Sequence, residues 1–170
     1  MSTENEGNYD LKQFSLIVFN CLFYVEQQIT FSHLLLKPES RKKEIVCLTE
    51  TLIEGVSKCN YELYAQLCDA NMTCFEPESN GNLINGLQFH KFYFDNLFSS
   101  KHSTNTTIVN PSVHILGEDS ACIAYVRLVQ LIDKNGAPKT IQWEETRVWT
   151  KKSNKWKCVH FHRSAAKMQL

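Results

Sequence analysis

The sequence has no excess of either charge, because 18 lysines and arginines are balanced by 18 aspartates and glutamates. Proteins that bind nucleic acid usually carry a basic excess, so the composition argues against that class of partner. Intrinsic disorder requires low hydrophobicity with high net charge, whereas this chain is 43% hydrophobic and neutral. Its 170 residues fit one domain. A neutral chain lacks the long-range repulsion that keeps copies apart, which favours self-association.

Long apolar segments are also missing. The run FSLIVFNCLFYV, over residues 14–25, has 12 residues, whereas a membrane-spanning helix needs about 20. A signal peptide begins with positive charge, but Glu4, Glu6 and Asp10 precede this run and only Lys12 opposes them. We therefore expect no membrane span, and we interpret the run as a strand or helix that packs on the domain or on a partner.

Paired cysteine motifs are absent as well. The seven cysteines are scattered, and no two are spaced as C-x-x-C, which leaves the usual zinc and thioredoxin-type patterns without support. An odd, scattered set is typical of a reducing compartment, so we expect free thiols and a cytoplasmic protein. His160 and His162 are metal ligands by type, but no third ligand is spaced to help them. We expect neither a metal nor a cofactor.

The sequence contains none of the catalytic motifs that would indicate a phosphotransferase or an esterase. It has no Gly-rich phosphate loop and no G-x-S-x-G elbow. The protein-kinase motifs H-R-D and D-F-G are missing too. We therefore expect a protein that is not a kinase.

The regular part of the chain begins near Pro38, which separates an N-terminal extension (residues 1–38) from a domain (residues 39–170). Ser40 and Asn60 are placed to cap two helices, and beyond residue 105 the apolar period changes to two. Helices followed by hairpin-connected strands indicate an α+β fold with an antiparallel sheet. The expected elements are helices over 40–59, 61–68 and 87–98, and strands over 72–75, 106–116, 120–132, 140–151 and 155–163, with turns at 133–136 and 153–154.

Three of the expected strands each carry one arginine among large apolar residues. Strict alternation places Arg127 and Arg147 on the apolar face of their strands, and Arg163 on the face of Val159 and Phe161 in the last strand. A desolvated guanidinium is costly unless it is paired, and three of them together would bind a carboxylate or phosphate. The pattern alone also fits a solvated face, because strand register cannot be fixed from it.

Several acidic residues and one histidine are candidates for the surroundings of these arginines. Glu145 could neutralise one of them, and His90, in the aromatic helix, could face the same pocket. Glu76 and Glu78 flank Pro77, and we interpret them as ion-pair partners in a loop rather than as an acid–base pair.

Four segments of the chain resemble the association (hub) domain of calcium/calmodulin-dependent protein kinase II, and in order they are FEPESNGNLINGLQFHKFYFDNL (75–97), TTIVNPSVHILGEDSACIAYVRLVQ (106–130), EETRVW (144–149) and VHFHRS (159–164). The resemblance covers roughly residues 41–165. It implies a nuclear-transport-factor-2-like cone, in which a long N-terminal helix packs in a curved antiparallel sheet. It also implies a ring-like assembly of stacked dimers, a dodecamer or a tetradecamer.

The resemblance further implies a pocket that accepts a small carboxylate. Its arginines match Arg127, Arg147 and Arg163, and its histidine matches His90. We expect three further residues to line or gate the pocket: Tyr125, Phe98 and Trp143. Residues 1–38 match neither the kinase nor its regulatory segment, Trp143 replaces a small polar residue, and the tail AAKMQL departs from the family.

Three interpretations of the chain stay open at this point. The first is a non-catalytic oligomerisation module that assembles with itself and with full-length kinase subunits. The second is a small-molecule enzyme of the same cone fold, of the isomerase or dehydratase type, with His90 or a nearby carboxylate as the base. The third is a fragment of a longer kinase.

Overall fold

The computed structural model describes residues 38–96 and 104–165. From Arg41 onward these residues belong to one compact unit. The apolar run over residues 14–25 and the gating residue Phe98 lie outside the described residues, so both interpretations stay predictions. Of the helices in the described ranges, none is long and apolar enough to cross a membrane.

A long helix over residues 38–57 opens the described chain. Ile45 and Leu52 are fully buried on it, and Leu48 and Val56, at helical spacing from them, pack against the same core. The prediction that Ser40 caps this helix was wrong, because the chain is already helical at residue 38. A proline is tolerated in the first turn of a helix, where its missing N–H would have no partner, so Pro38 is compatible with helix.

The short helix α2 (Tyr61–Leu67) begins where the sequence predicted. The side chain of Asn60 accepts a hydrogen bond of 3.0 Å from a backbone N–H in the first turn, which is the expected N-cap. At the other end, Cys68 already has extended backbone, with φ −93° and ψ 151°. Strand β1 (Cys68–Phe75) therefore starts at this residue and not at Met72.

Three small elements follow β1: the 3-10 turn η1 (Pro77–Ser79), the strand β2 (Ile84–Asn85) and the helix α3 (Gln88–Asn96). Helix α3 is the predicted aromatic-rich helix, and its buried residue is His90. Strand β2 had no sequence signal, because two residues are too short for an alternation to show.

Four long strands form three consecutive antiparallel pairs: β3 (Asn105–Ile115), β4 (Ser120–Ile132), β5 (Pro138–Lys152) and β6 (Lys155–Ala165). Their turns lie at the predicted positions. Gly136 has a φ of 80°, and Ser153 and Asn154 have φ of 49° and 61°, which is the left-handed backbone that a tight hairpin requires.

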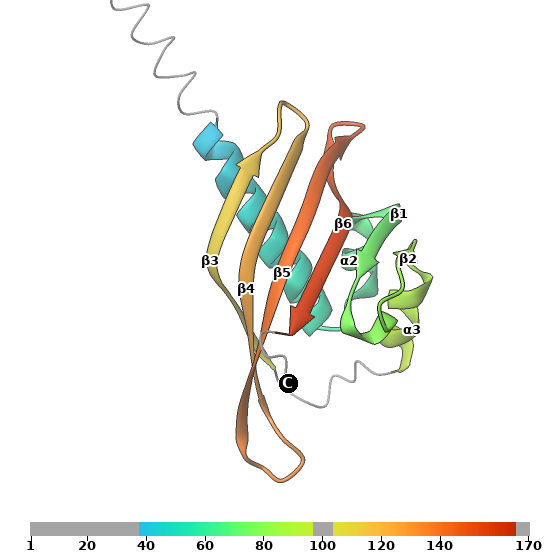
Figure 1. Ribbon diagram of the computed structural model, residues 1–170, viewed down its shortest axis with the longest axis vertical. Coiled ribbons are helices and arrows are strands. Elements are labelled where there is room, and N and C mark those ends of the chain that lie inside the picture. Colours follow the sequence, from blue (N-terminus) through green and yellow to red (C-terminus); the bar gives the residue numbers. More distant parts are fainter. Residues whose placement is uncertain (1–37, 97–103, 166–170) are drawn as a thin grey trace, which may run out of the picture. The chain divides into compact units, whose positions relative to one another are not determined.

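The six strands form one curved sheet in the order β2-β1-β6-β5-β4-β3 (Figure 1). Strand β1 pairs with β6 in parallel, whereas the sequence predicted only antiparallel neighbours. The difference arises because β1 reaches β6 through a long connection that contains α3 and the other long strands, and not through a hairpin. The fold is α+β, as predicted.

An irregularity in β6 changes which of its residues face inward. Trp149 pairs with Cys158, but its neighbour Val148 pairs with His160, so Val159 is an extra residue in β6. Cys158 is therefore buried in the place predicted for Val159, while the residues after the irregularity keep their predicted face. The prediction for Val159 was wrong because a β-bulge shifts the alternation by one residue.

The core lies between the long helix and the inner face of the sheet, which the helix crosses in Figure 1. Trp149 of β5 and Ile123 of β4 are fully buried there, against Ile45, Leu52 and Ile53 of the helix. The inner face of β4 and β5 also carries buried polar side chains, which are Arg127, Glu145 and Arg147.

Candidate functional site

A cavity of about 200 Å³ lies over the inner face of the sheet. Its polar lining comes from three strands, from helix α3 and from the turn after β1. The described residues that line it are Val56, Tyr64, Glu76, Glu78, His90, Tyr93, Phe94, Arg127, Arg147, Phe161 and Arg163. Four of the predicted site residues, the three arginines and the histidine, are therefore brought together around one cavity.

The strand register explains why the three arginines converge. Arg147 on β5 lies opposite Phe161, and Arg163 lies opposite Glu145, so β6 and β5 direct these residues to the same face. Tyr125 on β4 pairs with Glu145, and Arg127 lies two residues further along the same strand. Because side chains two residues apart share a face of a strand, Arg127 lies on the same face as the other two arginines. The alternative of a solvated face is excluded for two of them, since Arg127 and Arg147 are 7% and 2% exposed.

Glu145 lies between two of the arginines. One of its oxygens is 3.3 Å from Nη2 of Arg147, and the other is 3.5 Å from Nη1 of Arg127. The hydroxyl of Tyr125 donates a hydrogen bond of 2.5 Å to the same carboxylate. The side chain of Glu145 is completely buried, so this carboxylate neutralises buried positive charge, as the sequence suggested.

Arg147 has the most enclosed guanidinium in the site. Its Nε donates to the hydroxyl of Tyr125 at 2.8 Å, and its guanidinium carbon lies 3.9 Å from the ring centre of Phe161. Burial by itself lowers the pKa of Arg147, but Tyr125 and Glu145 outweigh it and hold the pKa well above its usual value. Burial lowers the pKa of Arg127, and the charge of Arg147 adds to this, whereas the charge of Glu145 offsets only part of it.

Arg163 is the arginine nearest the rim of the cavity. Its Nη2 is 3.1 Å from Oε2 of Glu76 and also pairs with Glu78, and its guanidinium carbon lies 4.8 Å from the ring centre of Trp143. Glu76 and Glu78 are thus ion-pair partners, as interpreted from the sequence. Burial raises the pKa of Glu76, but the contact with His90 and the charge of Arg163 outweigh it, so the pKa lies below its usual value.

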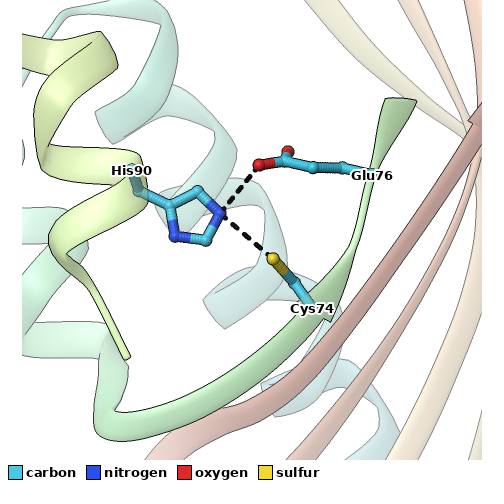
Figure 2. A group of neighbouring side chains, drawn as sticks. All are labelled: Cys74, Glu76 and His90. Carbon is cyan, nitrogen blue, oxygen red and sulfur yellow. Dashed lines mark hydrogen bonds and ion pairs between the residues drawn. The ribbon is translucent and has the colours of Figure 1, made fainter. Parts of the chain in front are cut away.

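His90 projects from α3 toward the end of β1, where it meets two side chains (Figure 2). Its Nε2 is 3.2 Å from Oε1 of Glu76 and 3.5 Å from Sγ of Cys74. Burial and the charge of Glu76 raise the pKa of Cys74 to about 12. Nδ1 of His90 is buried, and among the described residues it has no hydrogen-bond partner.

Two of the predicted lining residues have a different place. Tyr125 and Trp143 are not among the described residues that line the cavity. The hydroxyl of Tyr125 donates to Glu145 and accepts from Arg147, so Tyr125 connects these two side chains. The ring of Trp143 lies against the guanidinium of Arg163. Cys74 was not predicted at all, because the spacing of Cys74, Glu76 and His90 matches no known ligand motif and their convergence depends on the α3 packing.

Comparisons with known proteins agree on one family. A sequence model of the calcium/calmodulin dependent protein kinase II association domain matches residues 41–167. The alpha chain of calcium/calmodulin-dependent protein kinase type II from Drosophila melanogaster is 55% identical over 128 residues, which cover 75% of this chain and 24% of the fly protein. The association domain of the Caenorhabditis elegans kinase has a TM-score of 0.72 at 52% identity, covering 75% of this chain and 97% of that domain.

A more distant structure shows how general the fold is. A nuclear transport factor 2-like protein from Salmonella enterica, 18% identical, has a TM-score of 0.65 over 78% of this chain and 95% of its own, and it shares the fold alone. The chain spans only 17 to 24% of the length of curated kinases that it matches. By the match over residues 41–167, the chain belongs to the family of the calcium/calmodulin-dependent protein kinase II association domain.

Proposed function

We propose that this chain is a non-catalytic assembly module that forms a ring-like dodecamer or tetradecamer of stacked dimers. The observation that carries the proposal is the family match, which covers the association domain and no kinase domain. The absence of net charge in the whole sequence supports it, since little long-range repulsion opposes the packing of like subunits. The six cysteines in the described ranges are free, which supports a place in the reducing cytoplasm.

Apolar side chains on the surface give a physical basis for subunit contacts. Five large ones are exposed among the described residues: Phe75, Leu83, Phe92, Leu116 and Ile132. Phe92 is the most exposed of them, at 58%. Contact with another subunit would remove this apolar area from water, which contributes about 25 cal/mol for each Å².

The mass of the assembly in solution tests this proposal. Size-exclusion chromatography with light scattering, on the full 170-residue chain at micromolar concentration, should give a mass of twelve or fourteen subunits. A monomer under these conditions would contradict the proposal.

We propose further that the chain enters mixed rings with full-length kinase subunits. The support is that the matched kinases contain a segment 52 to 55% identical to this domain, so the same contacts are available to both partners. Co-expression of the chain with a tagged kinase, followed by native mass spectrometry of the purified assembly, should show rings of intermediate mass. Only pure kinase rings would count against co-assembly.

The cavity is proposed to bind a small carboxylate through Arg163. The donors of Arg147 already serve Tyr125 and Glu145, whereas Arg163 lies toward the rim, and its Nε is buried with no partner among the described residues. Glu78 pairs with Arg163 from a side chain that is 38% exposed, so it can leave. A ligand carboxylate would then take the place of Glu78 on the guanidinium.

Two variants with opposite expected effects test this mode of binding. Thermal melting with a panel of small carboxylates should show a rise in melting temperature that disappears in Arg163→Met, because the charge-assisted partner is lost. The rise should grow in Glu78→Gln, because the internal competitor is neutral. Arg41→Met is the control, because it also removes a guanidinium that makes hydrogen bonds, in this case to the carbonyls of Gly117 and Glu118. Arg41 is not among the described residues that line the cavity, so the rise in melting temperature should remain. A rise that is equal in all three variants would exclude Arg163 as the ligand partner.

A second candidate function is a small-molecule enzyme of the same fold. The contact between His90 and Glu76 favours it, because a buried imidazole beside a carboxylate can move a proton in the cavity. Incubation of the chain with the same carboxylates, followed by product analysis, separates the two functions. Turnover that His90→Gln abolishes would replace the non-catalytic proposal.

A further inference from the structure

Three chemically different side chains meet at the wall of the cavity, at the end of β1. Cys74 and Glu76 come from β1 and the residue after it, and His90 comes from α3 (Figure 2). All three residues are buried, and one ligand atom from each lies within 4.8 Å of the others. We infer that Cys74, Glu76 and His90 form a binding site for a divalent transition-metal ion of the zinc class.

Two of the three distances between the ligand atoms match those of a zinc tetrahedron, and the third, from sulfur to oxygen, is within 4.8 Å. Zinc bonds of about 2.3 Å to sulfur and about 2.0–2.1 Å to nitrogen and oxygen, at tetrahedral angles, separate sulfur from nitrogen by about 3.6 Å and nitrogen from oxygen by about 3.3 Å. In this protein Sγ of Cys74 is 3.5 Å from Nε2 of His90, and Nε2 is 3.2 Å from Oε1 of Glu76. Binding of the ion would therefore require little change in the sulfur–nitrogen distance or in the nitrogen–oxygen distance.

The charges at the site suit such an ion. Binding of the ion displaces the proton of the Cys74 thiol to solvent. The resulting thiolate and the Glu76 carboxylate supply two negative charges, which balance a divalent cation, and the neutral imidazole adds none. Arg163 is nearby, but it holds Oε2 of Glu76 at 3.1 Å and leaves Oε1 on the side of His90. The guanidinium of Arg163 and the metal ion thus use different oxygens of the Glu76 carboxylate.

The kinds of ligand atom decide which metal is favoured. Thiolate and imidazole select zinc, cobalt and similar ions over magnesium and calcium, which prefer oxygen ligands alone. Without an ion, Oε1 of Glu76 only accepts and therefore favours a proton on Nε2 of His90. No described neighbour bonds to Nδ1, so that nitrogen is open to carry the proton when the ion takes Nε2. A fourth ligand, water or a small anion, can come from the cavity that Glu76 and His90 line. This inference goes beyond the proposed assembly and ligand binding, and it depends on neither.

Titration of the full chain, reduced and metal-free, with Co²⁺ tests the site. Tetrahedral Co²⁺ bound to a thiolate gives an intense charge-transfer band in the near ultraviolet, so the readout reports the cysteine directly. We expect one Co²⁺ ion for each chain, with this band, and its loss when Zn²⁺ displaces the cobalt. Absence of a stoichiometric band from the wild-type chain would overturn the inference.

Variants assign the band to the three residues. Cys74→Ser should remove it, and Glu76→Gln and His90→Gln should each weaken Zn²⁺ binding by at least about tenfold, as the loss of even an outer partner does. Matched controls with the same chemistry lie elsewhere, at exposed positions: Cys47→Ser, Glu44→Gln and His114→Gln should bind as the wild type does. Circular dichroism of each variant verifies its fold. A band that survives in Cys74→Ser, or that disappears in Cys47→Ser, would place the metal elsewhere and refute the site.

Discussion

Replacing Glu145 with glutamine should destabilise the domain more than any other change that keeps the size of a side chain in the site. Glu145 lies 3.3 Å from Arg147 and 3.5 Å from Arg127, and its side chain is completely buried. Glutamine has nearly the same shape, so no cavity forms. It lacks the charge, however, and its amide N–H₂ group is a donor that faces arginine donors.

The magnitude follows from what the glutamine leaves behind. At an effective dielectric constant of about 20, unit charges 3.3 Å apart attract each other by about 5 kcal/mol, and desolvation of the carboxylate opposes part of this. Removal of one partner from a buried ion pair costs about 3–5 kcal/mol in practice. Here two buried guanidiniums lose their shared counter-charge, so we expect a loss of about 4 kcal/mol in the free energy of unfolding.

Urea denaturation followed by tryptophan fluorescence measures this loss. At an m-value of about 2 kcal/mol/M, the midpoint should fall by about 2 M. All samples need the same protein concentration, because assembly is coupled to stability. The control is Glu144→Gln, an exposed neighbour on the opposite face, which should change the free energy by less than about 0.5 kcal/mol.

A second substitution makes the reasoning refutable. Adding Arg147→Met to Glu145→Gln removes one of the two unpaired charges, so the double variant should be more stable than Glu145→Gln alone. If the two losses simply add, or if Glu145→Gln costs less than about 1 kcal/mol, the carboxylate is not the counter-charge described here.

Three further predictions concern the fold and its assembly. Asn60→Ala should lower the free energy of unfolding by about 1 kcal/mol, because the N-cap hydrogen bond is lost, whereas Asn60→Ser should retain most of it; equal urea midpoints would contradict this. Burial and the charge of His162 lower the pKa of His160 below 6.5, so the unfolded chain takes up the proton first and stability should fall as the pH decreases through 6.5. The slope of stability against pH should be smaller in His160→Gln, and an unchanged slope would exclude this histidine. Phe92→Glu should reduce the assembly mass measured by light scattering, whereas Gln88→Glu, on the same helix, should not; the same mass in both variants would remove Phe92 from the interface.

The arginine face was predictable because alternation is a local property of a strand. Once β4 and β5 are strands without an interruption between Tyr125 and Arg127, or between Glu145 and Arg147, side chains two residues apart must share a face. The burial of Arg127 and Arg147 was not predictable in this way, since it depends on what packs over the face. The resemblance to the association domain resolved that choice, and the structure agrees.

The remaining contacts depend on tertiary packing that leaves no periodic signal. Glu76 follows β1 directly, and its contacts with Arg163 and His90 require the parallel pairing of β1 with β6 and the placement of α3. The same packing brings Cys74 to His90. Residues near one another only through such pairings cannot be recognised from their spacing.

The bulge at Val159 has a consequence for the chemistry of the cavity. Counted from the turn at Ser153 and Asn154, an unbroken alternation would continue inward from Cys158 to His160 and His162, and it would turn Arg163 to the outer face. The one extra residue exchanges these two sets. It therefore gives the wall of the cavity an arginine, which stays charged throughout the physiological pH range, in place of two histidines.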